Sequence, residues 1–432
     1  MNELFLERIK KYFPENYEKY LNALKEPCTR GFFVNTEKGD IDSILNVVDF
    51  EYKNSEITDQ SFYHFNDNIG KTKAYELGLI YPQEIGASIT SRYFDAKNIN
   101  TIVDMCAAPG GKTINIINRL GNSPLVISND NSHLRASILS SNIERMGFDN
   151  VIVTNKECDV LANELEGFAD LVILDAPCSG EGMIRKYPEI LDTYNIENIN
   201  ELSGLQSNLL DYAYRICKKD GYILYSTCTY AFEEDEDQIR SFMGRYKDIE
   251  IIPFENQYES TLPGTIKMSP IDNTEGQFAV MMKKNSDVDN SVKVKYLKTV
   301  KEKLVEDFIK ENTDLKEYYL YKHNDNFYIS FVPLLDMKRH VLKYGVLLGE
   351  LKGKRFEPNH HFYRSNYISK HYRYTYDLND KEYDTYISGN ELRTDLGNHY
   401  YLVTYKGFAL GYGKCSNGQL KNKYPKGLRR VV

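Results

Sequence analysis

Short apolar runs recur through the middle of the chain, and segments of helical character separate them. The runs lie at residues 99–105, 125–130, 151–155, 169–175 and 221–227. Two of the separating segments are 131–147 and 205–219, and Lys218, Lys219 and Gly221 predict where the second helix stops. Strands that alternate with helices indicate βαβ units and a parallel sheet covered on both faces. The pattern therefore predicts an α/β core with a doubly wound, mostly parallel sheet.

The two flanks have different patterns. Residues 1–90 predict a helical opening followed by an irregular stretch. Residues 297–432 are rich in Tyr and alternate polar with apolar positions, as in FYISFV (327–332) and HYYLVTY (399–405), which predicts short strands in β-rich or α+β modules. The polar, acidic segment 286–291 is the expected linker. We therefore expect three regions, at 1–90, 91–284 and 292–432.

Composition narrows the class of protein. The 432 residues are 41% hydrophobic and 27% charged, which argues against a disordered, collagenous or coiled-coil chain. No run approaches the roughly 18 apolar residues of a membrane span, and Glu3 and Glu7 interrupt any secretory signal. Seven cysteines without short-loop pairing favour a reducing compartment. We expect a cytoplasmic protein without a membrane partner.

Charge is distributed unevenly along the chain. Residues 285–432 carry 26 basic and 18 acidic side chains, whereas residues 1–284 carry 28 basic and 44 acidic ones. The last 27 residues, 406–432, hold seven basic side chains and no acidic one. This asymmetry indicates that the carboxyl-terminal end handles a polyanion, with a solvated basic face as the alternative.

A glycine turn follows the first predicted strand, in the segment Asp104–Thr113. Lys112 and Thr113 resemble the end of a phosphate loop, but that loop needs glycine where Cys106 stands. A strand, a tight Gly110–Gly111 turn and a helix start remain, and such a turn lets a ligand approach the backbone closely. Asp130 ends the second strand, 20 residues after Gly110, where this fold places a ribose-binding carboxylate. The alternative is a tight turn with an exposed aspartate as a helix cap.

Two cysteines follow neighbouring strands, each at the carboxyl end. Cys178 lies three residues after Asp175, and Cys228 follows the fifth strand. In a parallel sheet this edge carries ligands and chemistry. Cys28, Cys158, Cys217 and Cys415 lack such a setting. The chain has no CxxC, and only two histidines precede residue 285, so we expect no metal.

Three motifs around these residues occur in a fixed order: MCAAPGGKT, LDAPCSGEGM and YSTCTY. They resemble the nucleotide, substrate and nucleophile motifs of the RNA cytosine-C5 methyltransferases, the family of bacterial rRNA methyltransferases B and F and the eukaryotic NOP2/Sun proteins. RGFFVNT (30–36), GLIYPQEIGAS (78–88) and EGQFAV (275–280) resemble flanking motifs of that family. The segment 410–429 resembles the carboxyl-terminal RNA-binding module of the methyltransferase F branch in particular.

The resemblance implies a Rossmann-like methyltransferase core, a PUA-like carboxyl-terminal module and a set of roles. Cys228 would be the nucleophile, Cys178 would assist product release, Asp175 would bond N3 of cytosine, and Lys112 would hold Asp175. S-adenosylmethionine would be the cofactor, bound by Asp130, Asp175 and the loop Cys106, Ala107, Ala108, Pro109, Gly110, Gly111 and Lys112. The adenine partner stays open among Asn155, Glu157 and Asp159.

The carboxyl-terminal region offers candidate RNA contacts. The tail supplies Lys414, Lys421, Lys423, Lys426, Arg429 and Arg430, with no acid within the tail to offset them. YISKHYRYTY (367–376) interleaves tyrosines with basic residues and suits base stacking, although an amphipathic strand with inward tyrosines explains it equally well. The His360–His361 pair is expected in a surface loop.

These observations together predict an S-adenosylmethionine-dependent RNA cytosine-C5 methyltransferase that acts on small-subunit (16S) rRNA as a monomer. The same enzyme acting on tRNA is the nearest alternative, because only the tail favours rRNA. A non-catalytic RNA-binding assembly factor is an alternative from another class, and the intact Cys178, Cys228 and Asp175 argue against it. A small-molecule methyltransferase would not explain the basic carboxyl-terminal module.

Overall fold

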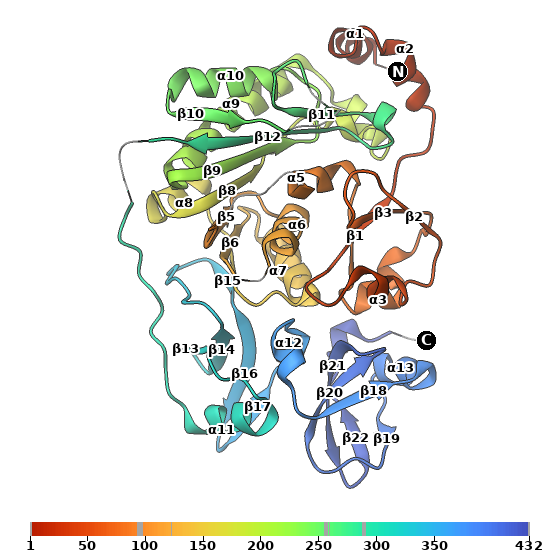
Figure 1. Cartoon of the computed structure of the whole chain (residues 1–432), viewed down its shortest axis with the longest axis vertical. Coiled ribbons are helices and arrows are strands. Elements are labelled where there is room, and N and C mark those ends of the chain that lie inside the picture. Colours follow the sequence, from red (N-terminus) through yellow and green to blue (C-terminus); the bar gives the residue numbers. More distant parts are fainter. Residues whose placement is uncertain are drawn as a thin grey trace.

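The computed structural model describes residues 2–92, 98–121, 123–254, 258, 260–286 and 291–430. Within them the strands form four sheets, one amino-terminal, one central and two carboxyl-terminal (Figure 1). The expected linker at 286–291 falls largely on 287–290, which lie outside the described residues. No described helix has both the length and the apolar character needed to cross a membrane.

Two helices, α1 (Glu3–Tyr12) and α2 (Tyr17–Ala23), open the chain as predicted. The stretch after them is not irregular, contrary to the prediction, because it forms an antiparallel sheet in the order β2-β3-β1-β4. Its strands are β1 (Gly31–Val34), β2 (Tyr52–Asn54), β3 (Ser61–His64) and β4 (Ile80–Pro82). Short helices accompany them: α3 (Ile41–Leu45), α4 (Lys73–Glu76) and α5 (Ile89–Arg92). Strands of three or four residues are too short for their alternation to stand out in the sequence.

The central sheet has the strand order β10-β12-β9-β8-β5-β6-β7-β15. Its parallel strands are β5 (Thr101–Asp104), β6 (Leu125–Asn129), β7 (Val151–Thr154), β8 (Ala169–Asp175) and β9 (Cys217–Thr227). All five runs predicted as strands are confirmed. Strand β12 (Gln277–Lys284) pairs antiparallel with β9, and β10 (Ile249–Ile252) and β11 (Ile266–Met268) pair antiparallel with β12. The order reverses between β5 and β8, and such a switch point opens a crevice for ligands.

Helices cover both faces of this sheet (Figure 1). On one face lie α8 (Cys158–Glu164), α9 (Ile196–Ile216) and α10 (Glu236–Arg245), which bury Leu161, Leu210 and Ile239 in one apolar cluster. On the other lie α6 (Gly111–Leu120) and α7 (His133–Met146), which bury Ile114, Leu139 and Ile143 in a second cluster. The predicted doubly wound α/β architecture is therefore present.

The end of α9 differs from the prediction. The helix stops at Ile216, and Cys217 already begins β9. Lys218, Lys219 and Gly221 do not end the helix: the pairing of β8 with β9 jumps from Ala169–Cys217 to Leu171–Tyr222 and leaves them in an irregularity of the strand. Asp220 there has a positive φ of 60°. Residues that commonly terminate helices here form a bulge at the start of a strand.

A third sheet, β13-β14-β16-β17, follows the core. It contains β13 (Tyr319–His323), β14 (Asn326–Ser330), β16 (Val346–Lys352) and β17 (Arg355–Pro358), with α11 (Lys303–Asn312) and α12 (His360–Arg364) beside it. Strand β15 (Val341–Tyr344) belongs instead to the central sheet, where it pairs antiparallel with β7. The carboxyl-terminal region therefore completes the edge of the core sheet.

The fourth sheet has the order β18-β20-β21-β22-β19. It contains β18 (Thr375–Leu378), β19 (Leu392–Arg393), β20 (Tyr400–Tyr405), β21 (Phe408–Ser416) and β22 (Gln419–Asn422), and α13 (Asp380–Ile387) packs against it. The tyrosine-rich pattern thus forms short strands in two small α+β units, as the sequence predicts.

Arg364, at the end of α12, joins three parts of the molecule. Its side chain is buried and donates to four backbone carbonyls from three separate segments. Two belong to Glu76 of the amino-terminal module (2.7 Å) and Arg145 of α7 (3.0 Å). The others belong to Ala409 (3.2 Å) and Leu410 (3.1 Å) of β21. One guanidinium therefore bonds the amino-terminal module, the core and the last sheet.

Candidate active site

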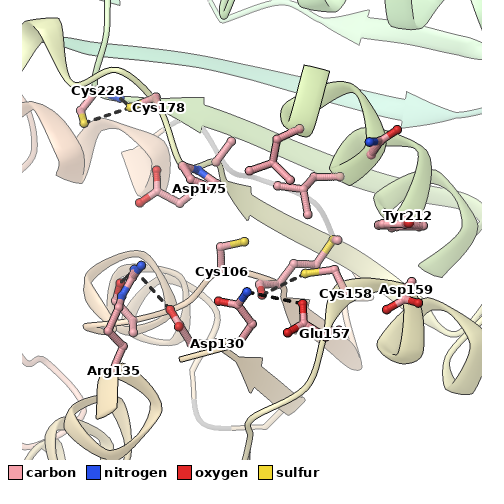
Figure 2. A pocket seen from close by; sticks show the side chains of 18 residues that line it. Cys106, Asp130, Arg135, Glu157, Cys158, Asp159, Asp175, Cys178, Tyr212 and Cys228 are labelled. Atoms are coloured by element: carbon pink, nitrogen blue, oxygen red, sulfur yellow. Dashed lines mark hydrogen bonds and ion pairs between the residues drawn. The ribbon is translucent and has the colours of Figure 1, made fainter. Parts of the chain in front are cut away.

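A cavity of about 420 Å³ opens at the carboxyl ends of the parallel strands. Residues that follow each of the five strands line it, and α9 adds Leu205, Asn208, Leu209 and Tyr212. Figure 2 shows Cys178 and Cys228 on one side of the cavity and Glu157, Asp159 and Tyr212 on the other, with Asp175 and Cys106 between them. The sequence does not predict the contribution of α9, because helix periodicity does not show which exposed positions face a ligand.

The loop between β5 and α6 forms one wall. Cys106 and Ala108 line the cavity, whereas the other residues of the predicted loop lie behind them. Gly110 has a positive φ of 117°, so only glycine adopts this turn without strain. A Cβ on Gly111 would lie 2.8 Å from Nε2 of Gln83, the end of a flexible side chain, so a larger residue there would displace that amide. Gly110 is therefore required by the backbone conformation of the turn, and Gly111 leaves room for Gln83.

Asp104 anchors the start of this loop. Its side chain is fully buried and accepts a hydrogen bond from the hydroxyl of Thr113 in α6. Burial raises the pKa of Asp104 to about 7. Asp104 therefore titrates near neutral pH, at the carboxyl end of β5.

Asp130 directly follows β6 at the cavity and is 2% exposed, so it is not the exposed helix cap of the alternative hypothesis. The cap of α7 is Ser132. Asp130 accepts a hydrogen bond from the backbone N–H of Ser132 (2.9 Å), and Arg135 lies 3.2 Å from its other oxygen. Arg135 also donates to the carbonyl of Ala108 (2.8 Å), so it links Asp130 to the loop. This arginine, five positions after Asp130, was not predicted.

The three candidates for the adenine contact lie in different places. Glu157 and Asp159 line the cavity. Asn155 lines a neighbouring hollow instead, and its amide donates to the backbone carbonyl of Asp130 (2.8 Å). The amide of Asn155 is therefore engaged in holding β6 and β7 together, which leaves the two acidic residues facing the cavity.

Cys158 also lines the cavity, contrary to the prediction that it lies away from the ligand edge of the sheet. It is the first residue of α8, and its thiol lies 3.8 Å from the carbonyl of Met105. A hydrogen bond with Cys158, together with burial, raises the pKa of the Cys106 thiol well above its ordinary value. The cavity wall thus carries a second pair of thiols, brought together from β5 and α8.

Asp175, the last residue of β8, is held from two sides. Nζ of Lys112 lies 2.7 Å from Oδ2, and the hydroxyl of Ser226 donates to Oδ1 at 2.9 Å. Lys112 is largely buried: burial acts to lower its pKa, but the carboxylate of Asp175 outweighs burial and raises the pKa above its usual value. Lys112 is therefore a cation beneath an aspartate that faces the cavity.

The two predicted thiols meet at the same edge. Sγ of Cys178 lies 3.3 Å from Sγ of Cys228, and it accepts a hydrogen bond from the backbone N–H of Cys228 at 3.4 Å. The hydrogen bond with Cys228, together with burial, raises the pKa of Cys178 well above its usual value. Cys178 therefore keeps its proton at neutral pH. The neighbouring thiol of Cys228 also interacts electrostatically with Lys112.

The basic tail lies on the last sheet. Lys414 and Lys421 face each other across β21 and β22 and are exposed, as are Lys423, Lys426 and Arg429. Arg430 differs from the prediction, because Glu76 of the amino-terminal module lies 2.5 Å from it. The tail contains no acid, but folding brings acids from distant segments to it. Arg430 is thus a structural contact rather than a free cation.

The tyrosines of segment 367–376 face different environments. Tyr372 is buried and donates to Asn312 (3.2 Å), and Tyr374 stacks on His399 with ring centroids 4.0 Å apart. Tyr367 is 45% exposed. The inward-tyrosine interpretation therefore holds for Tyr372. Tyr367 is exposed, but Phe331 and His371 already lie against its ring, with centroids 4.4 Å and 4.5 Å away.

His360 and His361 do not lie in a surface loop, contrary to expectation. They begin α12, and His361 is buried with Nδ1 accepting the backbone N–H of Leu347 (3.2 Å). Burial lowers the pKa of His360 to about 3 and that of His361 well below its usual value. Within the described residues, no group of three or more His, Cys, Asp or Glu side chains could hold a metal ion.

A parallel sheet with this strand order, a cavity at its switch point and facing acidic and thiol groups define a Rossmann-like methyltransferase. Three family models match the chain in order. Residues 1–85 match the N-terminal domain of 16S rRNA methyltransferase RsmF, 92–283 match 16S rRNA methyltransferase RsmB/F, and 373–430 match the methyltransferase RsmF PUA domain. The chain belongs to the 16S rRNA methyltransferase RsmB/F family.

Relatives and solved structures agree with this assignment. Ribosomal RNA small subunit methyltransferase F of Enterobacter sp. is 26% identical over 99% of this chain and 95% of its own length. The protein of the same name from Aliivibrio fischeri is 26% identical over 99% of this chain and 97% of its own length. A methyltransferase homolog protein from Pyrococcus horikoshii has a TM-score of 0.58 and 27% identity, covering 66% of this chain and 95% of that one. NSun6 from Pyrococcus horikoshii, solved with SFG, shares the fold, with a TM-score of 0.59 and 21% identity over 66% of this chain and 98% of that one.

Proposed function

We propose that this chain transfers a methyl group from S-adenosylmethionine to C5 of cytosine in small-subunit (16S) rRNA, through a covalent adduct on Cys228. The observation that carries the proposal is the contact between Cys178 and Cys228 at the edge where Asp175 and Lys112 form an ion pair. The names of the relatives and the PUA match support an RNA substrate.

The cavity residues fit the cofactor. Asp130 is a buried carboxylate at the cavity, and such a group suits a ribose diol. The loop 106–112 and Asp175 would hold the methionine part, and Glu157 or Asp159 would accept from the adenine amine. A protein of the same fold was solved with SFG, an analogue of S-adenosylmethionine. When bound, the cofactor supplies an electrophilic methyl group.

Cys228 begins the reaction. Cytosine C5 is a poor nucleophile until a thiolate adds to C6, which forms the S–C6 bond and moves the electrons of the C5–C6 double bond toward C5. Asp175, which would take a proton from solvent as the base binds, donates it in a hydrogen bond to N3 and stabilises the charge that develops in the ring, while Lys112 holds the carboxyl group from its buried side. C5 would then form its bond to the methyl group as the bond between that methyl group and the cofactor's sulfur breaks. The base must leave its stack first, because stacking hides C6.

Cys178 completes the reaction. Water in the open cavity takes the C5 proton, the C5–C6 double bond forms again, and the C6–S bond breaks. The leaving sulfur of Cys228 takes the proton of Cys178, whose thiol lies 3.3 Å away and whose raised pKa keeps it protonated. Cys178 then regains a proton from solvent, and Cys228 loses one to solvent before it attacks the next base. Without this proton donor, release should be slow and the adduct should persist.

Two variants test this division of labour. Cys228→Ser should be inactive and form no covalent RNA complex on a denaturing gel. Cys178→Ala should still attack C6, so protein–RNA complexes should accumulate. Complexes that accumulate in Cys228→Ser instead would exchange the two roles.

The substrate is tested by bisulfite sequencing of rRNA and tRNA from a strain that lacks the gene. Loss of 5-methylcytosine from small-subunit rRNA is expected. Loss confined to tRNA would favour the nearest alternative, the same chemistry on another RNA. An unchanged methylation pattern with defective subunit assembly would favour the non-catalytic assembly factor.

A further inference from the structure

Two buried glutamates lie next to the thiols and have no part in the mechanism above. Glu181 lies three residues after Cys178, and Glu234 lies six residues after Cys228. Both are fully buried, and burial raises the pKa of each carboxyl group. A buried carboxylate is costly unless donors surround it, so the donors show what each glutamate holds.

Glu181 holds the loop of the other cysteine. Its Oε2 accepts hydrogen bonds from the hydroxyl of Thr229 (3.1 Å) and the backbone N–H of Tyr230 (3.2 Å). These are the two residues that follow Cys228. The other oxygen accepts from the hydroxyl of Tyr194. A carboxylate from the Cys178 loop therefore fixes the backbone directly after the proposed nucleophile.

Glu234, from the Cys228 loop, holds the loop of Cys178. Its Oε2 accepts from the backbone N–H of Ser179 (2.9 Å) and from Nε2 of Gln206 (2.8 Å). Gln206 also donates to the carbonyl of Pro177 (2.9 Å). Both neighbours of Cys178 in the chain are thus tied, directly or through one amide, to a carboxylate from the Cys228 loop.

Two further contacts join the Cys178 loop directly to the Cys228 loop. The hydroxyls of Ser179 and Thr229, the residues after each cysteine, lie 2.8 Å apart. The backbone N–H of Gly182 donates to the carbonyl of Cys228 (3.0 Å). We call the reciprocal pair Glu181 and Glu234 the carboxylate clasp. Because each loop is bonded to the carboxylate of the other, the backbone of neither cysteine can shift without breaking hydrogen bonds to a buried carboxylate.

We propose that Glu181 and Glu234 are positioning residues that hold the two thiols in contact, and that Glu234 sets the rate of product release by holding Cys178 against Cys228. The inference rests on the proposed function, since it concerns how that reaction ends. Proton transfer needs the donor within hydrogen-bond reach, and a displacement of about 1 Å can cost on the order of 100-fold in rate. Loss of Glu234 should therefore act as loss of Cys178 does.

Glu234 offers a discriminating pair of variants. Its Oε1 is buried and has no hydrogen-bond partner among the described residues, while Oε2 accepts both bonds. Glu234→Gln can keep both bonds through its amide oxygen and place the NH₂ group where Oε1 stands. Glu234→Ala removes both. Asp170→Ala is the matched control, because Asp170 is also buried and accepts the backbone N–H of Thr101 (2.8 Å) at the opposite end of β8.

The experiment incubates each full-length variant with cytosine-containing rRNA and S-adenosylmethionine, and measures methyl transfer and the covalent fraction on a denaturing gel. Glu234→Ala should accumulate the adduct as Cys178→Ala does, with turnover reduced by roughly 100-fold and unchanged cofactor affinity. Glu234→Gln should turn over like the natural protein, and Asp170→Ala should lose stability without accumulating adduct. A Glu234→Ala protein without adduct, or equal accumulation of adduct in Asp170→Ala, would overturn the proposed positioning role of Glu234.

The same gel separates this proposal from the proposed function. If Cys178→Ala forms no covalent complex, the adduct chemistry itself fails, and the role of the clasp fails with it. If Cys178→Ala accumulates the complex and Glu234→Ala does not, the chemistry stands and only the positioning role of Glu234 is wrong.

Discussion

Replacing Arg364 with Met should loosen three parts of the protein at once. Met keeps an unbranched apolar stem in the same space but removes every donor of the guanidinium. Four carbonyls, from Glu76, Arg145, Ala409 and Leu410, then lose their partner. Arg364 is 4% exposed, so water reaches these carbonyls only if the interface opens.

The size of the effect follows from these four bonds. Hydrogen bonds to a charged donor contribute roughly 1.5–3 kcal/mol each, but contributions from one side chain do not add fully. A buried acceptor that is left without its donor costs roughly 1–3 kcal/mol. Because the four losses do not add fully, we expect Arg364→Met to lower the free energy of unfolding by about 2–5 kcal/mol, most of it at the contact between the last sheet and the rest of the chain.

Urea unfolding measures the loss of stability, and limited proteolysis measures how readily the last sheet separates from the rest of the chain. Arg364→Met should shift the unfolding midpoint and expose the last sheet, residues 375–422, to cleavage before the core. Arg355→Met is the control, because Arg355 is exposed on β17 and its loss should change stability by less than about 0.5 kcal/mol. Equal midpoints and equal cleavage rates for the two variants would refute the joining role of Arg364.

Three further predictions concern the cavity and the tail. Asp130→Ala should weaken S-adenosylmethionine binding by about 1–3 kcal/mol, and an unchanged calorimetric affinity would remove Asp130 from the site. Replacing Lys421, Lys423 and Lys426 with Gln should flatten the log-log salt dependence of RNA binding by about two to three units, whereas an unchanged slope in a folded triple variant would show that these charges are only solvated. Asp104 holds its proton more tightly in the folded chain, with a pKa of about 7, so its burial destabilises the fold increasingly as the pH rises from about 4 to 7. Asp104→Asn should therefore stabilise the protein by roughly 1–4 kcal/mol at pH 8 and by clearly less at pH 5, and equal thermal shifts at both pH values would contradict this.

The parts of the fold that the sequence predicts depend on contacts between near neighbours. Continuous apolar runs mark the parallel strands, because each is buried on both faces by helices nearby in the chain. The sequence also predicts the wrong end for α9, because the local pattern there is ambiguous. Lys218, Lys219 and Gly221 suit a helix end and a strand bulge equally, and only the pairing with β8 decides between them.

The sequence predicts the motifs that form the site but not the residues that hold those motifs in place. Residues directly after a strand must reach the sheet edge, so Asp175 and Cys228 could be placed near one another from the chain alone. Arg135 and Cys158 enter the same cavity from helices, and their direction depends on how those helices pack. No local sequence pattern marks Glu234 as a positioning residue, because the groups that donate hydrogen bonds to it lie 28 and 55 residues away in the chain.

The pairing of β15 with β7 has a consequence for how the protein is made. Val341 pairs with Thr154, so 187 residues (154 to 341) must be synthesised after β7 before its partner exists. At about 5–20 residues per second, the outer edge of β7 stays unpaired for roughly 10–40 s on every ribosome. An open strand edge is a template for pairing with another chain. A fragment that ends at residue 284 keeps this edge open permanently, so the isolated catalytic core should be the part of this protein most prone to self-association.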